Sequence, residues 1–175
     1  LERALGAEGA RAFAAAGAEA PPIGIRVEDA GARDAWLARL RDARPDGAFD
    51  AGRVSPHAVL ARGAGRIEAL PGFAEGAWTI QEEGSQLVAL ALGARAGETA
   101  LDACAGRGNK TSLVARAVGP AGAVDACDLH ASKLARLARE MARLTLAPRA
   151  TYAVDWSIGS GDVAGTYDRV LVDAP

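Results

Sequence analysis

The sequence has few of the residues from which disulfides and metal sites are built. Its two cysteines, Cys104 and Cys127, fall at the ends of separate predicted strands and form neither a disulfide framework nor a paired metal motif. Its two histidines, His57 and His130, have no partners at ligand spacing. We therefore expect a protein without a metal site that works in the reducing cytoplasm.

Long apolar runs and a strong charge of one sign are also missing. No run approaches the eighteen or more residues of a membrane span, and charged residues interrupt the alanine-rich start, so we expect neither a membrane span nor a signal peptide. The formal net charge is only −2, whereas electrostatic nucleic-acid binders are strongly basic, so RNA binding would need a local basic cluster. With half of its residues hydrophobic, the chain has the composition of a globular protein, which we expect to be a monomer without membrane contact.

The first part of the chain, residues 1–76, is predicted to be a small α+β subdomain. Alanine-rich residues 1–19 favour a helix, and the alternation of Ile23, Ile25 and Val27 favours a half-buried strand. Further elements are expected as a helix over Asp29–Arg44 and as strands over His57–Ala61 and Arg66–Leu70. Pro71-Gly72 through Gly76 mark the boundary of this part.

The second part, residues 77–175, alternates predicted helices and strands, which indicates an α/β fold with a parallel sheet and right-handed crossovers. Helices are expected over Ser85–Leu92, Lys110–Val118 and Ala131–Thr145, and strands over a segment from Thr99, Gly122–Cys127, Ala150–Val154 and Tyr167–Val172.

The segment from Thr99 to Thr111 is typical of a nucleotide-cofactor loop. An apolar strand runs into a glycine-bearing turn and then into an amphipathic helix, whose N-terminus contributes a positive dipole. Three acids then close later strands: Asp128, at the spacing of a ribose-binding acid, Asp155 and Asp173. All three are expected at one rim of the sheet, where an adenosine cofactor would bind.

Four motifs in this order are LDACAGRGNKT, VDACDLHASKL, YAVDWS and YDRVLVDAP, preceded by LPGF and by PPIGIRV at residues 21–27. The chain thereby resembles the RsmB and Sun family of S-adenosylmethionine-dependent RNA cytosine-5 methyltransferases over nearly its whole length. The resemblance implies a Rossmann-like class I methyltransferase fold, with only the N-terminal half of the sheet present, after an RNA-guiding subdomain. It implies RNA, ribosomal in this family, as the substrate, S-adenosylmethionine as the cofactor, and these cofactor-binding residues: Cys104, Ala105, Gly106, Arg107, Gly108, Asn109, Lys110, Asp128, Asp155 and Asp173.

The chain departs from the family pattern in two places. Its loop has Arg107 where the family has proline and Asn109 where it has glycine; because asparagine tolerates positive φ, we expect the turn to survive. The family also continues its Asp-Ala-Pro into a cysteine, with a second, nucleophilic cysteine further on, whereas this chain ends at Pro175. The resemblance thus implies that the 175 residues are an inactive fragment without a catalytic residue of their own.

Other interpretations of these residues stay open. Asp128 could also cap the following helix, and Asp155 could only start a turn. Asp102 is expected to be a structural acceptor for N–H groups of the loop. A basic face for RNA could be formed by Arg26, Arg33, Arg53, Arg62 and Arg66, which could equally be ordinary solvated surface. The alternative functions are a non-catalytic RNA-binding protein with a decayed methyltransferase domain, and a methyltransferase for a protein or small molecule. A nicotinamide oxidoreductase is disfavoured because the loop lacks Gly-x-Gly-x-x-Gly.

Overall fold

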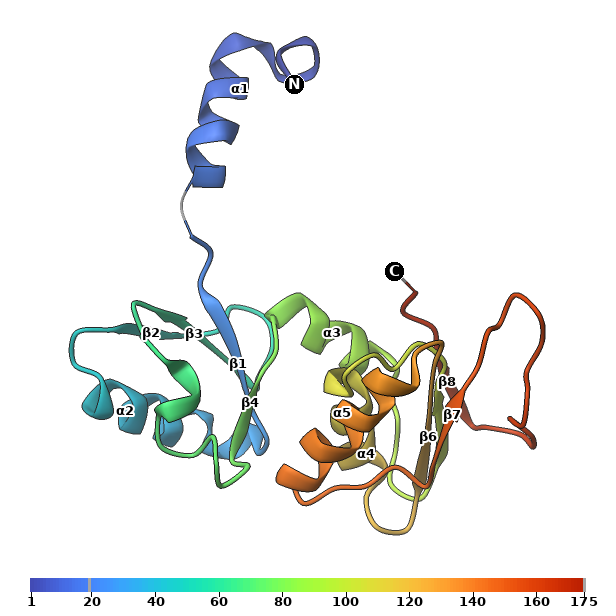
Figure 1. Cartoon of the computed structure of the whole chain (residues 1–175). Coiled ribbons are helices and arrows are strands. Elements are labelled where there is room, and N and C mark those ends of the chain that lie inside the picture. The colour runs from blue at the N-terminus through green and yellow to red at the C-terminus, as the bar shows by residue number, and fades with distance from the viewer. Residues whose placement is uncertain (19, 175) are drawn as a thin grey trace.

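The chain forms two four-stranded sheets, one antiparallel and one parallel (Figure 1). The computed structural model describes residues 1–18 and 20–174. Glu19, the end of the first predicted helix, and Pro175, the end of the last motif, lie outside the described residues. Strands β1 to β4 form the antiparallel sheet, and strands β5 to β8 form the parallel sheet.

The antiparallel sheet has the strand order β2-β3-β1-β4. Its elements follow α1 (Glu2–Ala18), which stands away from both sheets in Figure 1, and are β1 (Ile23–Val27), α2 (Arg33–Ala43), β2 (Ala48–Ala51), β3 (Ala58–Arg62) and β4 (Trp78–Ile80). Two 3-10 turns complete this part, at Ala30–Ala32 and Ile67–Ala69. Alternate strand residues meet the apolar face of α2 in one core, which contains Ile25, Leu40, Phe49, Val59 and Trp78.

The sequence predicted β1, α2 and β3, but one predicted strand is wrong. Residues 66–70 form a 3-10 turn, because the N–H groups of Ala69 and Leu70 bond to carbonyls three residues back instead of to a neighbouring strand. The short strands β2 and β4 were not predicted. Since β4 pairs with β1, the first sheet extends beyond residue 76, and the division of the chain at that residue stays a prediction.

The parallel sheet has the order β7-β6-β5-β8, as in a Rossmann-like fold, which confirms the predicted fold class. Its elements are α3 (Glu83–Ala91), β5 (Thr99–Asp102), α4 (Asn109–Val118), β6 (Ala123–Asp128), α5 (Ala131–Arg143), β7 (Ala150–Ala153) and β8 (Arg169–Leu171). Helices α3, α4 and α5 cover the face of this sheet that is turned toward the antiparallel sheet (Figure 1). Their apolar stripes supply most of the core, including Leu113, Val114, Leu134, Leu137 and Met141.

The opposite face of the parallel sheet has a different cover. Residues 154–168 run over it without a helix or strand, and Val163 and Tyr167 from this segment pack on Leu101 and Cys127. The Tyr167 hydroxyl also donates a hydrogen bond to Asp125 (2.7 Å), which Arg149 pairs with as well. The segment is therefore held on the sheet both by this polar cluster of Tyr167, Asp125 and Arg149 and by its small apolar contact with Leu101 and Cys127.

Arg26 joins the two parts of the chain. It extends from β1 and is completely buried, so the sequence-based suggestion that it contributes to an exposed basic face is wrong. Its guanidinium donates hydrogen bonds to Gln81 Oε1 (2.6 Å), to the Asn109 carbonyl (2.5 Å) and to Ser112 Oγ (2.9 Å). Burial lowers the pKa of Arg26, an effect opposed by its ion pair with Glu28. The start of α4, which follows the glycine-bearing loop, is thereby fixed to the antiparallel sheet.

Candidate functional site

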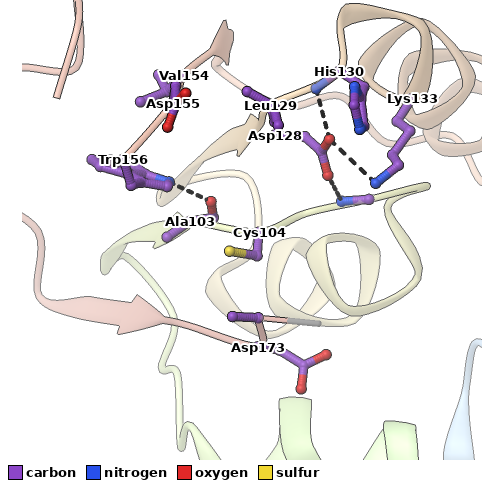
Figure 2. Close-up of a pocket in the computed structure, with 12 residues that line it drawn as sticks. Ala103, Cys104, Asp128, Leu129, His130, Lys133, Val154, Asp155, Trp156 and Asp173 are labelled. Atoms are coloured by element: carbon purple, nitrogen blue, oxygen red, sulfur yellow. Dashed lines mark hydrogen bonds and ion pairs between the residues drawn. The ribbon is translucent and has the colours of Figure 1, made fainter. Parts of the chain in front are cut away.

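A cavity of about 460 Å³ lies at the carboxyl ends of the parallel strands (Figure 2). It receives the loop after β5 and the residues that follow β6, β7 and β8, which parallel strands bring to the same rim. Five of the ten site residues expected from the sequence line it: Cys104, Gly106, Asp128, Asp155 and Asp173. The volume is in the range of cofactor and ligand pockets.

Two glycines shape the loop. Gly106 has φ +57° and Gly108 has φ +90°, and a Cβ on Gly108 would come within 2.7 Å of Leu137 Cγ. Asn109 and Arg107 are not in the left-handed region, so the expectation that asparagine must tolerate a positive φ here is corrected. Asn109 instead begins α4, and its side-chain amide donates to the Ile80 carbonyl (3.2 Å) in β4.

Asp128 connects this loop to the start of α5. Its Oδ2 accepts a hydrogen bond from the Gly106 N–H (3.0 Å), and its Oδ1 accepts one from the His130 N–H (2.8 Å). Lys133 lies 3.5 Å from the same Oδ1, so the carboxylate has a cationic neighbour. The N-cap residue of α5 is His130 rather than Asp128. Because a carboxylate has about four lone-pair positions, Asp128 retains acceptor capacity toward the cavity.

Asp155 and Asp173 have different surroundings. Asp155 is exposed, and its Oδ1 accepts hydrogen bonds from the backbone N–H and the hydroxyl of Ser157, which hold its pKa below the usual value. It therefore starts a turn, one of the two roles that the sequence left open. Asp173 forms an ion pair with Lys110, with 2.6 Å between Oδ2 and Nζ. Figure 2 shows Asp128 and Asp173 on opposite sides of Cys104.

A second, smaller cavity of about 280 Å³ adjoins the first. The two share Cys104, Gly106 and Asp173, and the second is also lined by the remaining predicted site residues except Gly108, namely Ala105, Arg107, Asn109 and Lys110. The loop thus contributes to both cavities, and of the Asp173–Lys110 pair, Asp173 lines both whereas Lys110 lines only the smaller one.

Asp102, which also lines the smaller cavity, is a buried carboxyl. The Thr111 hydroxyl donates to its Oδ2 (2.7 Å), so Asp102 is a structural acceptor, with a hydroxyl of α4 as donor where loop N–H groups were expected. Its Oδ1 is buried and has no hydrogen-bond partner within residues 1–18 and 20–174. Burial is the main cause that raises the pKa of this carboxyl.

The two cysteines have poor environments for a thiolate. Burial raises the pKa of Cys104, and the nearby carboxylates of Asp102, Asp128 and Asp173 raise it further. Cys127 is completely buried, which raises its pKa to about 11. Both thiols are therefore protonated at neutral pH, and their environments are the opposite of those that activate a cysteine.

Several residues that line the larger cavity were not predicted from the sequence. Leu129 and Trp156 directly follow two of the strand-end acids and are 57% and 40% exposed, and Lys133 lies one helical turn further on. The sequence did contain a signal for two of them, because a large apolar residue directly after a strand-end acid indicates an apolar wall beside the predicted site. Trp156 is fixed by a hydrogen bond from its indole Nε1 to the Ala103 carbonyl (2.7 Å), as Figure 2 shows.

Neither a metal-ligand cluster nor a membrane-spanning helix occurs within residues 1–18 and 20–174. No three or more histidine, cysteine or acidic side chains there come together in a way that could hold a metal ion. No helix in the same residues combines the length and apolar character needed to cross a membrane.

Comparisons of sequence identify relatives of this chain. Residues 89–175 match the family model described as 16S rRNA methyltransferase RsmB/F. Ribosomal RNA small subunit methyltransferase B of Cronobacter sakazakii is 32% identical over 164 residues, which are 90% of this chain and 36% of the relative. A probable enzyme of the same name from Synechocystis is 38% identical over 112 residues, 63% of this chain and 25% of the relative. The chain thus spans about a third or less of the length of these curated relatives.

Two solved structures from Pyrococcus horikoshii have the same fold. A methyltransferase homolog protein has a TM-score of 0.70 and 24% identity, over 85% of this chain and 48% of the other. NSun6, solved with SFG, has a TM-score of 0.77 and 14% identity, over 99% of this chain and 68% of the other. At these identities the two structures establish the fold alone. The sequence relatives and the family model, taken with this fold, show that the chain belongs to the RsmB/F family of 16S rRNA methyltransferases.

Proposed function

We propose that this protein provides the cofactor-binding half of an S-adenosylmethionine-dependent enzyme that methylates carbon 5 of cytosine in ribosomal RNA in the cytoplasm. The observation that carries the proposal is the convergence of the glycine-bearing loop and the residues after three parallel strands on one cavity. The curated relatives named as ribosomal RNA methyltransferases support the substrate class.

The lining of the larger cavity suits an adenosine cofactor. Asp128 would accept hydrogen bonds from the ribose hydroxyls, since its carboxylate has free acceptor positions. The exposed apolar surfaces of Leu129 and Trp156 would cover a flat base, and the loop, residues 104–110, would hold the polar end of the molecule. When bound, S-adenosylmethionine supplies an electrophilic methyl group on a sulfonium.

The smaller cavity suits the reacting base. Lys110 offers N–H donors and Asp173 offers carboxylate acceptors at one place. A base edge presents donors and acceptors together, so this set would orient it. The shared residues Cys104, Gly106 and Asp173 put this position directly beside the proposed cofactor cavity.

Cytosine carbon 5 needs covalent activation before it can accept a methyl group. A thiolate that adds to carbon 6 produces an enamine that is nucleophilic at carbon 5, and a base later removes the carbon 5 proton as the thiolate leaves. The raised pKa values of Cys104 and Cys127 make both unsuited to this step. We infer that the nucleophile is not among residues 1–175 and that these residues alone do not methylate RNA.

Calorimetry of cofactor binding tests the first half of the proposal. Asp128→Ala should weaken S-adenosylmethionine binding by about 10- to 150-fold, because hydrogen bonds to a charged acceptor contribute about 1.5–3 kcal/mol. The matched control is Asp46→Ala, which removes an exposed carboxylate from the antiparallel part and should leave the affinity unchanged. An Asp128→Ala variant that keeps the wild-type affinity would refute the assignment.

Methyl transfer from labelled cofactor to unmodified ribosomal RNA tests the second half. Residues 1–175 should give no labelled RNA, and a longer protein that adds the family's cysteines should give it. Labelling by residues 1–175 that disappears in Cys104→Ser would place the nucleophile in the loop and overturn our interpretation of that thiol.

A further inference from the structure

We propose that the groove between the antiparallel sheet and α5 binds the phosphates of a single-stranded RNA segment through Arg107, Arg136 and Arg139. This inference rests on the proposed function, because it takes RNA as the substrate. It assigns a path for the strand next to the base position.

The groove has a volume of about 560 Å³ and is distinct from both cavities at the strand ends. One wall comes from the antiparallel part, with Phe73, Thr79 and Ile80. The other wall comes from the loop and from α5, with the three arginines of the proposal. Both parts of the chain are therefore needed to form it.

The other two charged residues of the groove already have structural partners. Arg143 stacks on the Phe73 ring, with its Cζ 4.1 Å from the ring centroid, and donates to the Phe73 and Trp78 carbonyls. Glu140 pairs with Arg143 and accepts a hydrogen bond from the Thr79 hydroxyl (2.6 Å). The only carboxylate of the groove is thus neutralised within its wall.

Arg107, Arg136 and Arg139 are exposed and have no such partners. In the part of the chain that the structure describes, their guanidinium groups form no ion pair and no hydrogen bond. Three unpaired cations in one groove contrast with a formal net charge of −2 for the whole chain. A planar guanidinium fits a phosphate with two parallel hydrogen bonds, so the arrangement favours a polyanion with phosphate groups.

The groove continues toward the proposed base position. Arg107 and Asn109 line both the groove and the smaller cavity, where Lys110 and Asp173 lie. A strand whose backbone follows the groove could therefore turn one base into that cavity. An acidic protein segment would satisfy the arginines but would have no use for a base-sized cavity at the end of the path, and this favours RNA.

Arg107 lines the groove and the smaller cavity but not the larger cavity proposed for the cofactor. Its charge is therefore available to an RNA strand without competing with cofactor binding in the larger cavity.

The test measures binding of a fluorescent twelve-nucleotide unstructured RNA by anisotropy at several salt concentrations. The proteins are the full chain, Arg136→Gln with Arg139→Gln, and Arg107→Gln alone. Each phosphate contact to a single strand contributes about 0.7 to the slope of log affinity against log salt. At 0.1 M salt, one decade below 1 M, the loss of one contact therefore lowers the RNA affinity about fivefold. The double variant should bind about 25-fold more weakly, with a slope reduced by about 1.4, and Arg107→Gln about fivefold more weakly.

Arg95→Gln is the matched control, because it removes the same charge from an exposed position before β5, at the opposite rim of the sheet. It should bind RNA like the wild type. The double variant should also keep the wild-type melting temperature and S-adenosylmethionine affinity, which separates this proposal from that of cofactor binding.

Two results would overturn the inference. Wild-type RNA affinity and salt slope in the double variant would show that the groove does not hold the strand, while cofactor binding could still stand. Binding of polyglutamate as tight as that of RNA, with the same dependence on Arg136 and Arg139, would assign the groove to an acidic protein instead.

Discussion

Replacement of Arg26 by alanine should destabilise the protein more than replacement of any exposed arginine. The side chain is completely buried and bonds to Glu28, Gln81, Asn109 and Ser112. Its removal leaves the Gln81 amide oxygen and the Ser112 hydroxyl without this donor and opens a cavity at the junction of the two parts. Breaking a buried ion pair on one side costs about 3–5 kcal/mol, a large share of the ~5–15 kcal/mol stability of a domain.

The fate of Glu28 modifies this figure. Arg116 also donates to Glu28, with 3.0 Å between Nη2 and Oε2, so the carboxylate is not left alone in the variant. We therefore expect a loss near the lower limit, about 3 kcal/mol, for Arg26→Ala. Arg26→Met fills most of the space and should lose about 1–2 kcal/mol less, because it avoids most of the cavity.

Urea unfolding followed by circular dichroism gives the free energies, with Arg95→Ala as the exposed control. Because Arg26 connects the antiparallel sheet to α4, its loss should also separate one unfolding transition into two. If Arg26→Ala lowers the free energy of unfolding by less than about 1 kcal/mol and still unfolds in a single transition, apolar packing alone holds the two parts together.

Three further predictions concern single contacts. Asn109→Gly should lower stability by about 1 kcal/mol through its lost hydrogen bond but change cofactor affinity less than twofold; loss of binding by calorimetry would contradict this. At pH 8.5 a thiol reagent should modify Cys104 well before Cys127, whose pKa of about 11 allows a thiolate fraction of only about 0.3%, as peptide mass spectrometry would show. Burial alone would raise the pKa of Asp125, but hydrogen bonds from Arg149 and Tyr167 hold that pKa below its usual value. The ionised carboxylate therefore stabilises the folded protein above about pH 4, and this stabilisation is lost as the pH falls through the folded pKa. Arg149→Gln should therefore cost about 1 kcal/mol at pH 7, discounted because Arg149 is half exposed, and the difference from wild type in urea unfolding should shrink below pH 4.

The sequence predicted the parallel sheet well, because its strands are apolar runs bounded by glycine and acids and its helices have clear apolar stripes. It failed for β2 and β4, which have only four and three residues and owe their conformation to pairing with strands distant in the sequence. The burial of Arg26 was also unpredictable, because it depends on a helix more than eighty residues away in the sequence. The pattern of apolar and polar residues around Arg26 carries no information on such a distant contact.

The candidate site divides in a similar way. The strand-end acids were predictable because parallel strands share a rim, and Asp128, Asp155 and Asp173 all line the larger cavity. The pairing of Lys110 with Asp173 and the contribution of Trp156 depend on how the segment after β7 and the end of β8 turn, which periodicity does not encode.

The hydrogen bond from Trp156 to the Ala103 carbonyl gives the molecule an optical reporter. Of the three tryptophans, Trp78 is completely buried, whereas the Trp156 indole is part of the cavity wall and 40% exposed. Its emission should lie to the red of that of Trp78 and respond when an aromatic ring covers the indole. Cofactor exchange could then be followed by stopped-flow fluorescence on the unlabelled protein, with Trp156→Phe as the silent reference.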